Sequence, residues 1–357
     1  MNILIIALSG LGDALMFTPA LSLLAERHPQ ARIDVLTMFK ATNDIYKNNP
    51  HVRTIHFWNF LKENPIKSFF FLLSLRGHYS ISINVFPANR FPYNIISRII
   101  GAPKRLGHNY LHTNIRSLNF LNNHKVLEND NLHNVEENIR LVDLLSQSSD
   151  ARDISLQLYL DNETKNFANS WFEKEKISFN TPIIGIHAGS AIFKNQIHKR
   201  WDKDKYAELA SELQKKYNAT LLLFGGPEEK DVNDFISAHS PARIVTTPSL
   251  LTALGIMAHC SLFVSNDSGL MHCATALGIP TVAIFGYTSH VHTKPWSQNS
   301  IVVRKDDLPC SPCFYFSPKP AQCREFHGEE KYKCIKEISV VMVRNACETL
   351  LQKYKGI

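Results

Sequence analysis

Short apolar runs alternate with segments of helical periodicity along almost the whole chain, and this alternation constrains the fold more than any other feature of the sequence. Ile3–Ala7 is a predicted strand, and residues 13–28 have the apolar spacing of a helix. The alternation restarts after Thr181-Pro182, with a predicted strand at 183–187. Strands that alternate with helices are typical of parallel sheets covered on both faces. We therefore predict an α/β protein with two Rossmann-like domains.

The length of 357 residues also fits two domains. We predict an N-terminal domain over residues 1–170 and a C-terminal domain over 171–336, which includes a cysteine-rich loop at 309–334. A final helix is predicted over 337–357. Residues 87–130 are interpreted as short elements and loops. Two such domains that face each other place a cleft between the carboxyl ends of their sheets, where ligands of open α/β sheets bind.

Composition narrows the class of protein. A hydrophobic fraction of 44% and a charged fraction of 20% exclude a disordered or fibrous chain. The net charge of +7 suits acidic small molecules, an anionic membrane surface or nucleic acid, but no nucleic-acid motif is present and we expect no such partner. The apolar run Phe69–Leu75 is far shorter than the roughly 20 residues of a spanning helix, and it is predicted to be a core helix.

The N-terminus has no basic segment before its first apolar run, so we interpret that run as a buried strand and not as a signal peptide. Together with seven cysteines, this predicts a cytoplasmic protein without assumed disulfides.

A glycine-containing loop follows the first predicted strand. Gly10 and Gly12 allow a tight turn, and the helix that starts there favours an anion at its N-terminus. A dinucleotide fingerprint requires Gly or Ala at position 15, and Leu15 makes this a poor NAD site. Asp13 is a candidate catalytic carboxylate, and the alternative is that it caps the helix.

A second loop joins a predicted strand to a helix at residues 265–272. It carries Asp267, Ser268, Gly269, Leu270 and His272. Small and polar groups at the positive end of a helix suit a phosphate or a ribose. His272 lies one helical turn after Ser268, so both side chains can face one ligand. The alternative is a capped helix with a packed histidine.

A third loop combines a turn at His187–Ser190 with a basic pair. Lys199 and Arg200 can neutralise a departing diphosphate, or they can belong to a surface loop before a helix. The adjacent Asp202-Lys203-Asp204 looks like a metal-binding Asp-x-Asp, but its place in a first helical turn favours stabilisation of the helix dipole. A fourth loop contains Glu228 and Glu229 after two glycines, and either can bind ribose hydroxyls.

In combination and in this order, these segments resemble glycosyltransferase family 9, which includes the ADP-heptose:lipopolysaccharide heptosyltransferases. The resembling segments are Gly-Leu-Gly-Asp (10–13), His-Ala-Gly-Ser (187–190), Lys-Arg-Trp (199–201), Gly-Gly-Pro-Glu-Glu (225–229) and Asn-Asp-Ser-Gly-Leu-Met-His (266–272).

The resemblance implies a GT-B fold and inverting, metal-independent transfer of a heptose from ADP-heptose to the lipopolysaccharide inner core, with no cofactor needed for catalysis. It implies that Asp13 is the general base, that Lys199 steadies the diphosphate, and that the N-terminal domain binds the acceptor. The remaining donor-binding candidates are Gly10, Gly12, His187, Ser190, Arg200, Glu228, Glu229, Asp267, Ser268, Gly269, Leu270 and His272. One departure is the stretch 246–250, which lacks the bulky apolar residue that the heptosyltransferases often place against adenine.

A basic stretch in the N-terminal domain is a candidate acceptor surface. Its members are Arg90, Arg98, Lys104, Arg105 and Arg116. A phosphorylated, lipid-linked sugar would suit such a surface, and so would a solvated face without a role. Because that acceptor lies in the membrane, peripheral contact with the inner face of the inner membrane is a further expectation.

Four cysteines follow the last predicted strand. Cys310 and Cys313 have the spacing that can clasp one metal ion, and Cys323 and Cys334 could complete a structural iron or zinc site. The resemblance adds that a branch of the family that glycosylates autotransporters holds iron with four cysteines. The alternatives are that the thiols pack without metal or that His327 is a ligand. The other three cysteines, Cys260, Cys273 and Cys347, are predicted to be buried hydrophobic residues.

Several other functions fit part of the pattern. A family 9 transferase could act on a protein acceptor or use another nucleotide sugar. A NAD-linked oxidoreductase is disfavoured by Leu15. A non-catalytic nucleotide-binding protein would keep the donor loops and tolerate the loss of Asp13.

Overall fold

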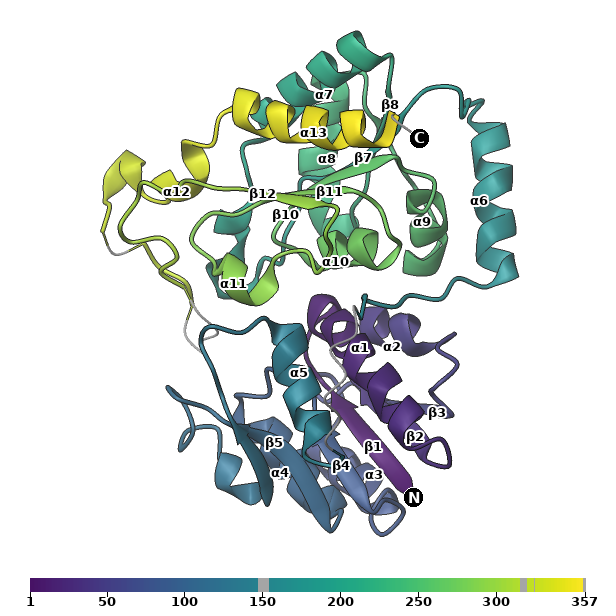
Figure 1. The fold of residues 1–357 in the computed structure, drawn as a ribbon, viewed down its shortest axis with the longest axis vertical. Helices are drawn as coiled ribbons and strands as arrows, with labels where there is room; N and C mark the ends of the chain where they lie inside the picture. Colours follow the sequence, from purple (N-terminus) through teal and green to yellow (C-terminus); the bar gives the residue numbers. More distant parts are fainter. Residues whose placement is uncertain (147–153, 315–319, 324, 356–357) are drawn as a thin grey trace. The chain divides into compact units, whose positions relative to one another are not determined.

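The computed structural model describes residues 1–146, 154–314, 320–323 and 325–355 (Figure 1). The chain divides into two compact units, Met1–Tyr159 and Leu160–Ile357. Each unit contains a six-stranded parallel sheet with helices on both faces. The two predicted Rossmann-like domains are therefore present.

The sheet of the first unit has the strand order β3-β2-β1-β4-β5-β6. Its strands are β1 (Asn2–Ala7), β2 (Arg32–Thr37), β3 (Thr54–Phe57), β4 (Ile81–Asn84), β5 (Lys104–Asn109) and β6 (His124–Leu127). Its helices are α1 (Leu11–Arg27), α2 (Lys40–Tyr46), α3 (Pro65–Ser74), α4 (Phe91–Ile100) and α5 (Asn134–Asp143), with a short 3₁₀ turn at Asn119–Leu121.

Alternate residues of β1 point to two separate cores, which explains why this strand is apolar throughout. Ile3 and Ile5 pack under α1 and α5, where Phe17 is fully buried. Leu4 and Ile6 pack on the other face, under α3 and α4. The strand pairs with β2 on one side and β4 on the other, so it lies in the middle of the sheet.

The sheet of the second unit has the strand order β12-β11-β10-β7-β8-β9. Its strands are β7 (Ile183–His187), β8 (Thr220–Leu223), β9 (Arg243–Ile244), β10 (Leu262–Asn266), β11 (Thr281–Ile284) and β12 (Ser300–Val303). Its helices are α6 (Asn162–Lys174), α7 (Lys203–Tyr217), α8 (Lys230–His239), α9 (Leu250–Met257), α10 (Gly269–Ala276), α11 (His290–Thr293), α12 (Lys333–Lys336) and α13 (Val340–Lys355). Short 3₁₀ segments lie at Phe193–Lys199, Pro227–Glu229 and Gly328–Glu330.

Helix α6 crosses the predicted boundary at residue 170 and packs on α9 within the second unit. Gly255 permits this contact, since a Cβ atom there would lie 2.8 Å from the carbonyl oxygen of Thr164. The final helix, α13, also belongs to this unit. It runs alongside α7 in Figure 1 and contributes Val343, Cys347 and Leu350 to the core.

Two sequence-based expectations for the first unit need correction. Residues 87–130 contain the ten-residue helix α4 and the two regular strands β5 and β6. The predicted core helix at 69–75 is α3, but only one face of it is covered: Leu72 and Leu75 are buried, whereas Phe69 and Phe70 are exposed. No helix among the described residues is both long and apolar enough to span a bilayer.

Candidate active site

The loop that carries Asp13 lies at the carboxyl end of the central strand β1. Gly10 is the N-cap residue of α1, and Asp13 is the third residue after it. The Asp13 carboxylate accepts a hydrogen bond from the Gly10 amide, with Oδ2 3.2 Å from the nitrogen. The alternative role of Asp13 as the N-cap is therefore wrong in detail, although its carboxylate does bind the first amide of the helix end.

Neighbouring segments fix the position of this loop. Ser9 donates a hydrogen bond to the carbonyl oxygen of Pro87 (3.0 Å), and the Tyr93 hydroxyl donates to the carbonyl oxygen of Leu8 (3.1 Å). Burial raises the pKa of the Tyr93 phenol, and the nearby Asp13 charge adds to this rise. Asp13 is half-buried and Gly10 is exposed. The loop thus holds a half-buried carboxylate at the carboxyl end of the central strand, where hydrogen bonds to neighbouring segments fix its position.

In the second unit, the predicted donor loops meet at the carboxyl ends of β7, β8 and β10. Asn266, the last residue of β10, joins them. Its Oδ1 accepts hydrogen bonds from the Trp201 amide (3.0 Å) and the Tyr206 hydroxyl (2.9 Å), and its Nδ2 donates to the carbonyl oxygen of Gly189 (3.0 Å). Asn266 belongs to one of the resembling motifs, but the sequence did not predict this role for it. Its position at the end of a fully buried strand was the available signal.

Lys199 and Asp267 form an ion pair at this edge, with Nζ 2.7 Å from Oδ2. Arg200 makes a second one with Glu229, in which Nη2 lies 3.0 Å from Oε1. The same guanidinium donates to the carbonyl oxygen of Ser190 (2.7 Å). The two predicted cations are therefore held in place by two predicted acids from other loops.

The structure separates the two glutamates that the sequence could not distinguish. Glu229 is buried, and its Oε2 also accepts a hydrogen bond from the Gly226 amide (2.9 Å). Glu228 is exposed and lies outside this network. Gly189 allows the loop after β7 to lie close to Glu229. A Cβ atom at this position would lie 2.3 Å from Glu229 Cγ and 2.6 Å from His187 Cε1.

Helix α10 begins at this edge with Ser268 as its N-cap residue, and the Ser268 hydroxyl accepts a hydrogen bond from the Met271 amide (3.4 Å). Gly269 and Leu270 form the first turn and are half-buried. Amides in a first helical turn lack intrahelical partners, so this end of the helix favours an anion.

Both predicted histidines of the donor loops are buried and neutral near pH 7. Burial lowers the pKa of His187, whose Nδ1 lies 3.0 Å from the carbonyl oxygen of Phe224. Burial lowers the pKa of His272 to about 4, with the Asp267 charge opposing and the Lys199 charge adding to the effect. The Nδ1 atom of His272 has no hydrogen-bond partner among the described residues. A buried polar atom in this state is available to a ligand.

Asp202 is the N-cap residue of α7, and its Oδ1 accepts a hydrogen bond from the Asp204 amide (2.9 Å). The predicted positions are confirmed, with Asp202 as the helix cap and Asp204 in the first turn.

The structure does not gather the five basic residues of the predicted acceptor surface. Arg90 precedes α4 and follows β4, and Arg116 lies between β5 and β6, so both follow the carboxyl ends of strands, as Asp13 does. Arg98 lies in the last turn of α4, and Lys104 begins β5, which places both at the opposite edge of the sheet. Arg105 follows Lys104 and donates to the carbonyl oxygens of Ala102 (2.7 Å) and Leu121 (3.0 Å).

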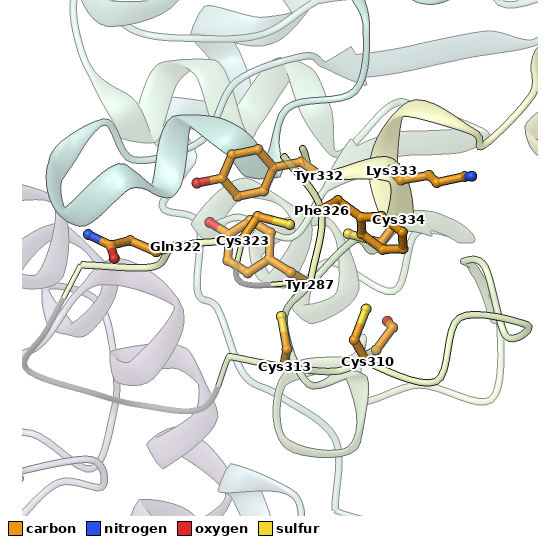
Figure 2. A pocket seen from close by; sticks show the side chains of 10 residues that line it. Tyr287, Cys310, Cys313, Gln322, Cys323, Phe326, Tyr332, Lys333 and Cys334 are labelled. Atoms are coloured by element: carbon orange, nitrogen blue, oxygen red, sulfur yellow. The ribbon is translucent and has the colours of Figure 1, made fainter. Parts of the chain in front are cut away.

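The four cysteines of the predicted metal site line one small cavity of about 10 Å³ in the second unit (Figure 2). The side chains of Cys310 and Cys313 are directed toward the space that Cys323 and Cys334 border. Burial raises the pKa of Cys334 to about 12, and the other three thiols add to this rise. No group of three or more His, Cys, Asp or Glu side chains in the described part of the chain is arranged so that it could hold a metal ion. The remaining three cysteines are buried, as predicted.

A family model described as glycosyltransferase family 9 (heptosyltransferase) matches residues 74–321. Among curated proteins, the chain is 26% identical over 302 residues to lipopolysaccharide heptosyltransferase 3 of Escherichia coli, covering 81% of this chain and 85% of that protein. It is 25% identical over 350 residues to lipooligosaccharide heptosyltransferase 2 of Campylobacter jejuni, covering 96% of both.

The fold is also similar to those of solved glycosyltransferase structures. The structure of an ADP-heptose lipopolysaccharide heptosyltransferase II from E. coli aligns with a TM-score of 0.76 at 24% identity, covering 99% of this chain and all of that one. An iron-containing dodecameric glycosyltransferase from enterotoxigenic E. coli aligns with a TM-score of 0.57 at 14% identity, covering 100% of this chain and 80% of that one. These alignments confirm the predicted GT-B fold class.

Proposed function

Because the chain belongs to glycosyltransferase family 9, we propose that it transfers a heptose from ADP-heptose to the inner core of lipopolysaccharide. The observation that carries this proposal is the arrangement at the edge of the second sheet. There Lys199 is paired with Asp267 just before the N-terminus of α10, and the next residue, Arg200, is paired with Glu229. Two cations and the positive end of a helix form a suitable site for a nucleoside diphosphate. The curated relatives that the chain resembles are heptosyltransferases.

The donor would bind in the second unit with its diphosphate against Lys199 and the amides of Gly269 and Leu270. Glu229 supports this placement, since a buried carboxylate beside a glycine turn can accept hydrogen bonds from ribose hydroxyls. His272 Nδ1 would bind the phosphates or the sugar, because it is buried without a partner among the described residues. His187 and Ser190 shape the loop around Arg200.

The reaction would proceed as a single displacement that inverts the anomeric carbon. The Asp13 carboxylate takes the proton of the acceptor hydroxyl as that oxygen forms a bond to the anomeric carbon. The bond between this carbon and the diphosphate oxygen breaks, and ADP leaves with the electron pair. Lys199, Arg200 and the α10 terminus stabilise the charge that develops on ADP, so the transfer needs no metal ion for this purpose.

We place the acceptor on the first unit. Asp13 lies in the loop after β1, and Arg90 and Arg116 are the two members of the predicted basic stretch that lie at the same end of the sheet. A phosphorylated sugar would be attracted by these two arginines. Since the proposed acceptor is lipid-linked, the protein would work in the cytoplasm at the inner face of the inner membrane.

The experiment that tests this function measures ADP release from a panel of nucleotide sugars, with and without a lipid A acceptor that carries inner-core sugar. We expect acceptor-dependent ADP release with ADP-heptose only. ADP-heptose would not be the donor if another nucleotide sugar supported the acceptor-dependent reaction. ADP release that depends on an autotransporter protein instead of the lipid would identify a protein as the acceptor.

The convergence of four cysteines supports a second proposal, that Cys310, Cys313, Cys323 and Cys334 hold a structural iron or zinc ion. Four thiols reach one cavity from separate loop segments and α12, and the cavity has room for one small ion. Thiolates are the preferred ligands for iron and zinc in such sites. The four sulfurs are not in a coordinating arrangement in the described structure, so metal binding would require these side chains to move.

Elemental analysis of the purified protein tests the metal proposal. We expect about one iron or zinc ion per chain and a clear loss of metal in Cys310→Ser. Ser311→Ala is the matched control, because its side chain lies in the same loop and binds the carbonyl oxygen of Gly286 instead. Fully folded protein that contains no metal, with unchanged unfolding in the presence of a chelator, would contradict the proposal.

A further inference from the structure

Helix α3 and the loop before it expose an apolar surface on the first unit. Leu61, Ile66, Phe69 and Phe70 are 72%, 67%, 46% and 63% exposed. Phe69 and Phe70 follow Ile66 by three and four residues in the helix, so all three side chains lie on one face. We call these four residues, together with Lys62 and Lys67, the α3 surface.

The opposite face of α3 is firmly attached to the unit, so the exposed side chains do not result from a loose helix. Leu72 belongs to the core beneath α3 and α4. The ring of Trp58 stacks on Phe71 with centroids 4.3 Å apart, and its Nε1 donates a hydrogen bond to Ser68 (2.9 Å). The side chain of Asn64 caps the helix by accepting from the Ile66 amide (2.8 Å). The α3 surface is therefore presented on a rigid support.

The charges beside these apolar groups are mainly positive. Lys62 and Lys67 are exposed and directly follow Leu61 and Ile66 in the sequence, and Glu63 is the acid in this segment. Large apolar side chains with flanking lysines match the interface of a bilayer that contains anionic lipids, where rings enter the acyl boundary and cations meet the headgroups. A protein partner fits this surface less well, because lysine is depleted in protein–protein interfaces relative to the rest of a protein surface.

The position of the α3 surface also fits a membrane contact. Strand β3 leads into α3, so the start of the helix lies at the same end of the first sheet as the loop that carries Asp13. At ten residues α3 is too short to span a bilayer, which leaves an interfacial contact. We propose that the α3 surface docks the protein onto an anionic phospholipid bilayer. This inference rests on the proposed function, since a lipid-linked acceptor presents its sugars at that surface.

The test measures partitioning of the full-length protein onto vesicles of phosphatidylethanolamine and phosphatidylglycerol, without any substrate. The double variant Ile66→Gln/Phe70→Gln removes two side chains that make few contacts in the protein, so the fold is expected to persist. We expect its partitioning to weaken by about tenfold or more, because two large apolar groups no longer enter the lipid. The control Phe179→Gln/Val341→Gln removes two exposed apolar groups of the second unit and is expected to bind as the wild type does.

A charge-reversed variant, Lys62→Glu/Lys67→Glu, tests the lipid class. We expect weaker binding to these vesicles and little difference from wild type on phosphatidylcholine alone. Equal binding of the wild type and Ile66→Gln/Phe70→Gln would overturn the proposal, as would failure of the wild type to bind. A wild-type dimer that this double variant dissociates in sedimentation experiments would also overturn it, because a second copy would then cover the surface.

Activity separates this inference from the proposed function. We expect Ile66→Gln/Phe70→Gln to retain transfer to a deacylated, water-soluble acceptor and to lose most transfer to the same acceptor in vesicles. If the wild type binds vesicles through the α3 surface but transfers heptose to neither acceptor, the membrane-docking inference is supported and the proposed function is wrong.

Discussion

Lys199 and Asp267 form an ion pair at the carboxyl edge of the second sheet, with Nζ 2.7 Å from Oδ2 and side-chain exposures of 14% and 7%. The lysine ends the loop after β7, and the aspartate begins the turn into α10. This pair joins two loops that lie 68 residues apart in the sequence. It therefore holds a cation beside the helix terminus at which a diphosphate is proposed to bind.

Removal of this cation should slow sugar transfer more than it weakens the fold. For Lys199→Ala we expect kcat to fall by about a hundredfold or more, because the charge that develops on the leaving ADP loses a donor. Steady-state kinetics with ADP-heptose measures this effect, and thermal unfolding checks the fold. Lys203→Ala is the control, since Lys203 packs over the Phe235 ring instead. Wild-type turnover in Lys199→Ala would remove the lysine from the reaction.

The two neighbouring glutamates should behave differently on substitution. Glu229→Gln loses the ion pair with Arg200, and we expect its affinity for ADP to fall by about tenfold, as for loss of one charge-assisted contact. Glu228→Gln is expected to bind ADP within about twofold of the wild type, because this side chain is exposed and outside the network. Calorimetric titration with ADP distinguishes them. The reverse order of effects would assign the ribose contact to Glu228.

The β7 loop should not tolerate a methyl group at position 189. In Gly189→Ala the new Cβ would lie 2.3 Å from Glu229 Cγ, so either the loop or Glu229 must move. We expect destabilisation of about 1–3 kcal/mol, measured by urea unfolding, together with weaker ADP binding. Gly226→Ala is the matched control for stability, because its Cβ would make an ordinary contact of 3.6 Å with Glu229 Oε2. Equal stability of the two variants would contradict this account of Gly189.

Buried His272 should make the protein sensitive to acid. Burial lowers its pKa to about 4 in the folded protein from 6.5, so the unfolded chain binds its proton first as the pH falls. The free energy of unfolding is therefore highest above pH 6.5 and decreases as the pH falls from 6.5 toward 4. The total decrease due to this histidine is roughly 3 kcal/mol. We expect His272→Gln to flatten the unfolding free energy over this range. An unchanged pH profile in this variant would show that the imidazole is not buried as described.

Local sequence patterns were sufficient to predict the central strands and the loops after them. Strands β1, β7 and β10 are buried on both faces and therefore appear as continuous apolar runs. Strands β5 and β6 were missed because they are partly exposed and contain polar residues, so their pairing with neighbouring strands determines them.

Contacts between distant segments were beyond prediction from the pattern. Asn266 bonds to Trp201 and Gly189 across more than sixty residues, and no local periodicity encodes such a bond. The run of phenylalanines at 69–71 predicted a core helix, since composition alone does not show whether another element covers a helix face. The structure leaves Phe69 and Phe70 uncovered.

Transfer by Asp13→Asn is the most direct test of the proposed mechanism. Asparagine can still accept the hydrogen bond from the Gly10 amide, so the N-terminus of α1 is preserved while the proton acceptor is lost. In a single-turnover experiment with ADP-heptose and the lipid acceptor, we expect ADP to bind as in the wild type and sugar transfer to fall by about 10²–10⁴-fold. Transfer at the wild-type rate would contradict the assignment of Asp13 as the general base.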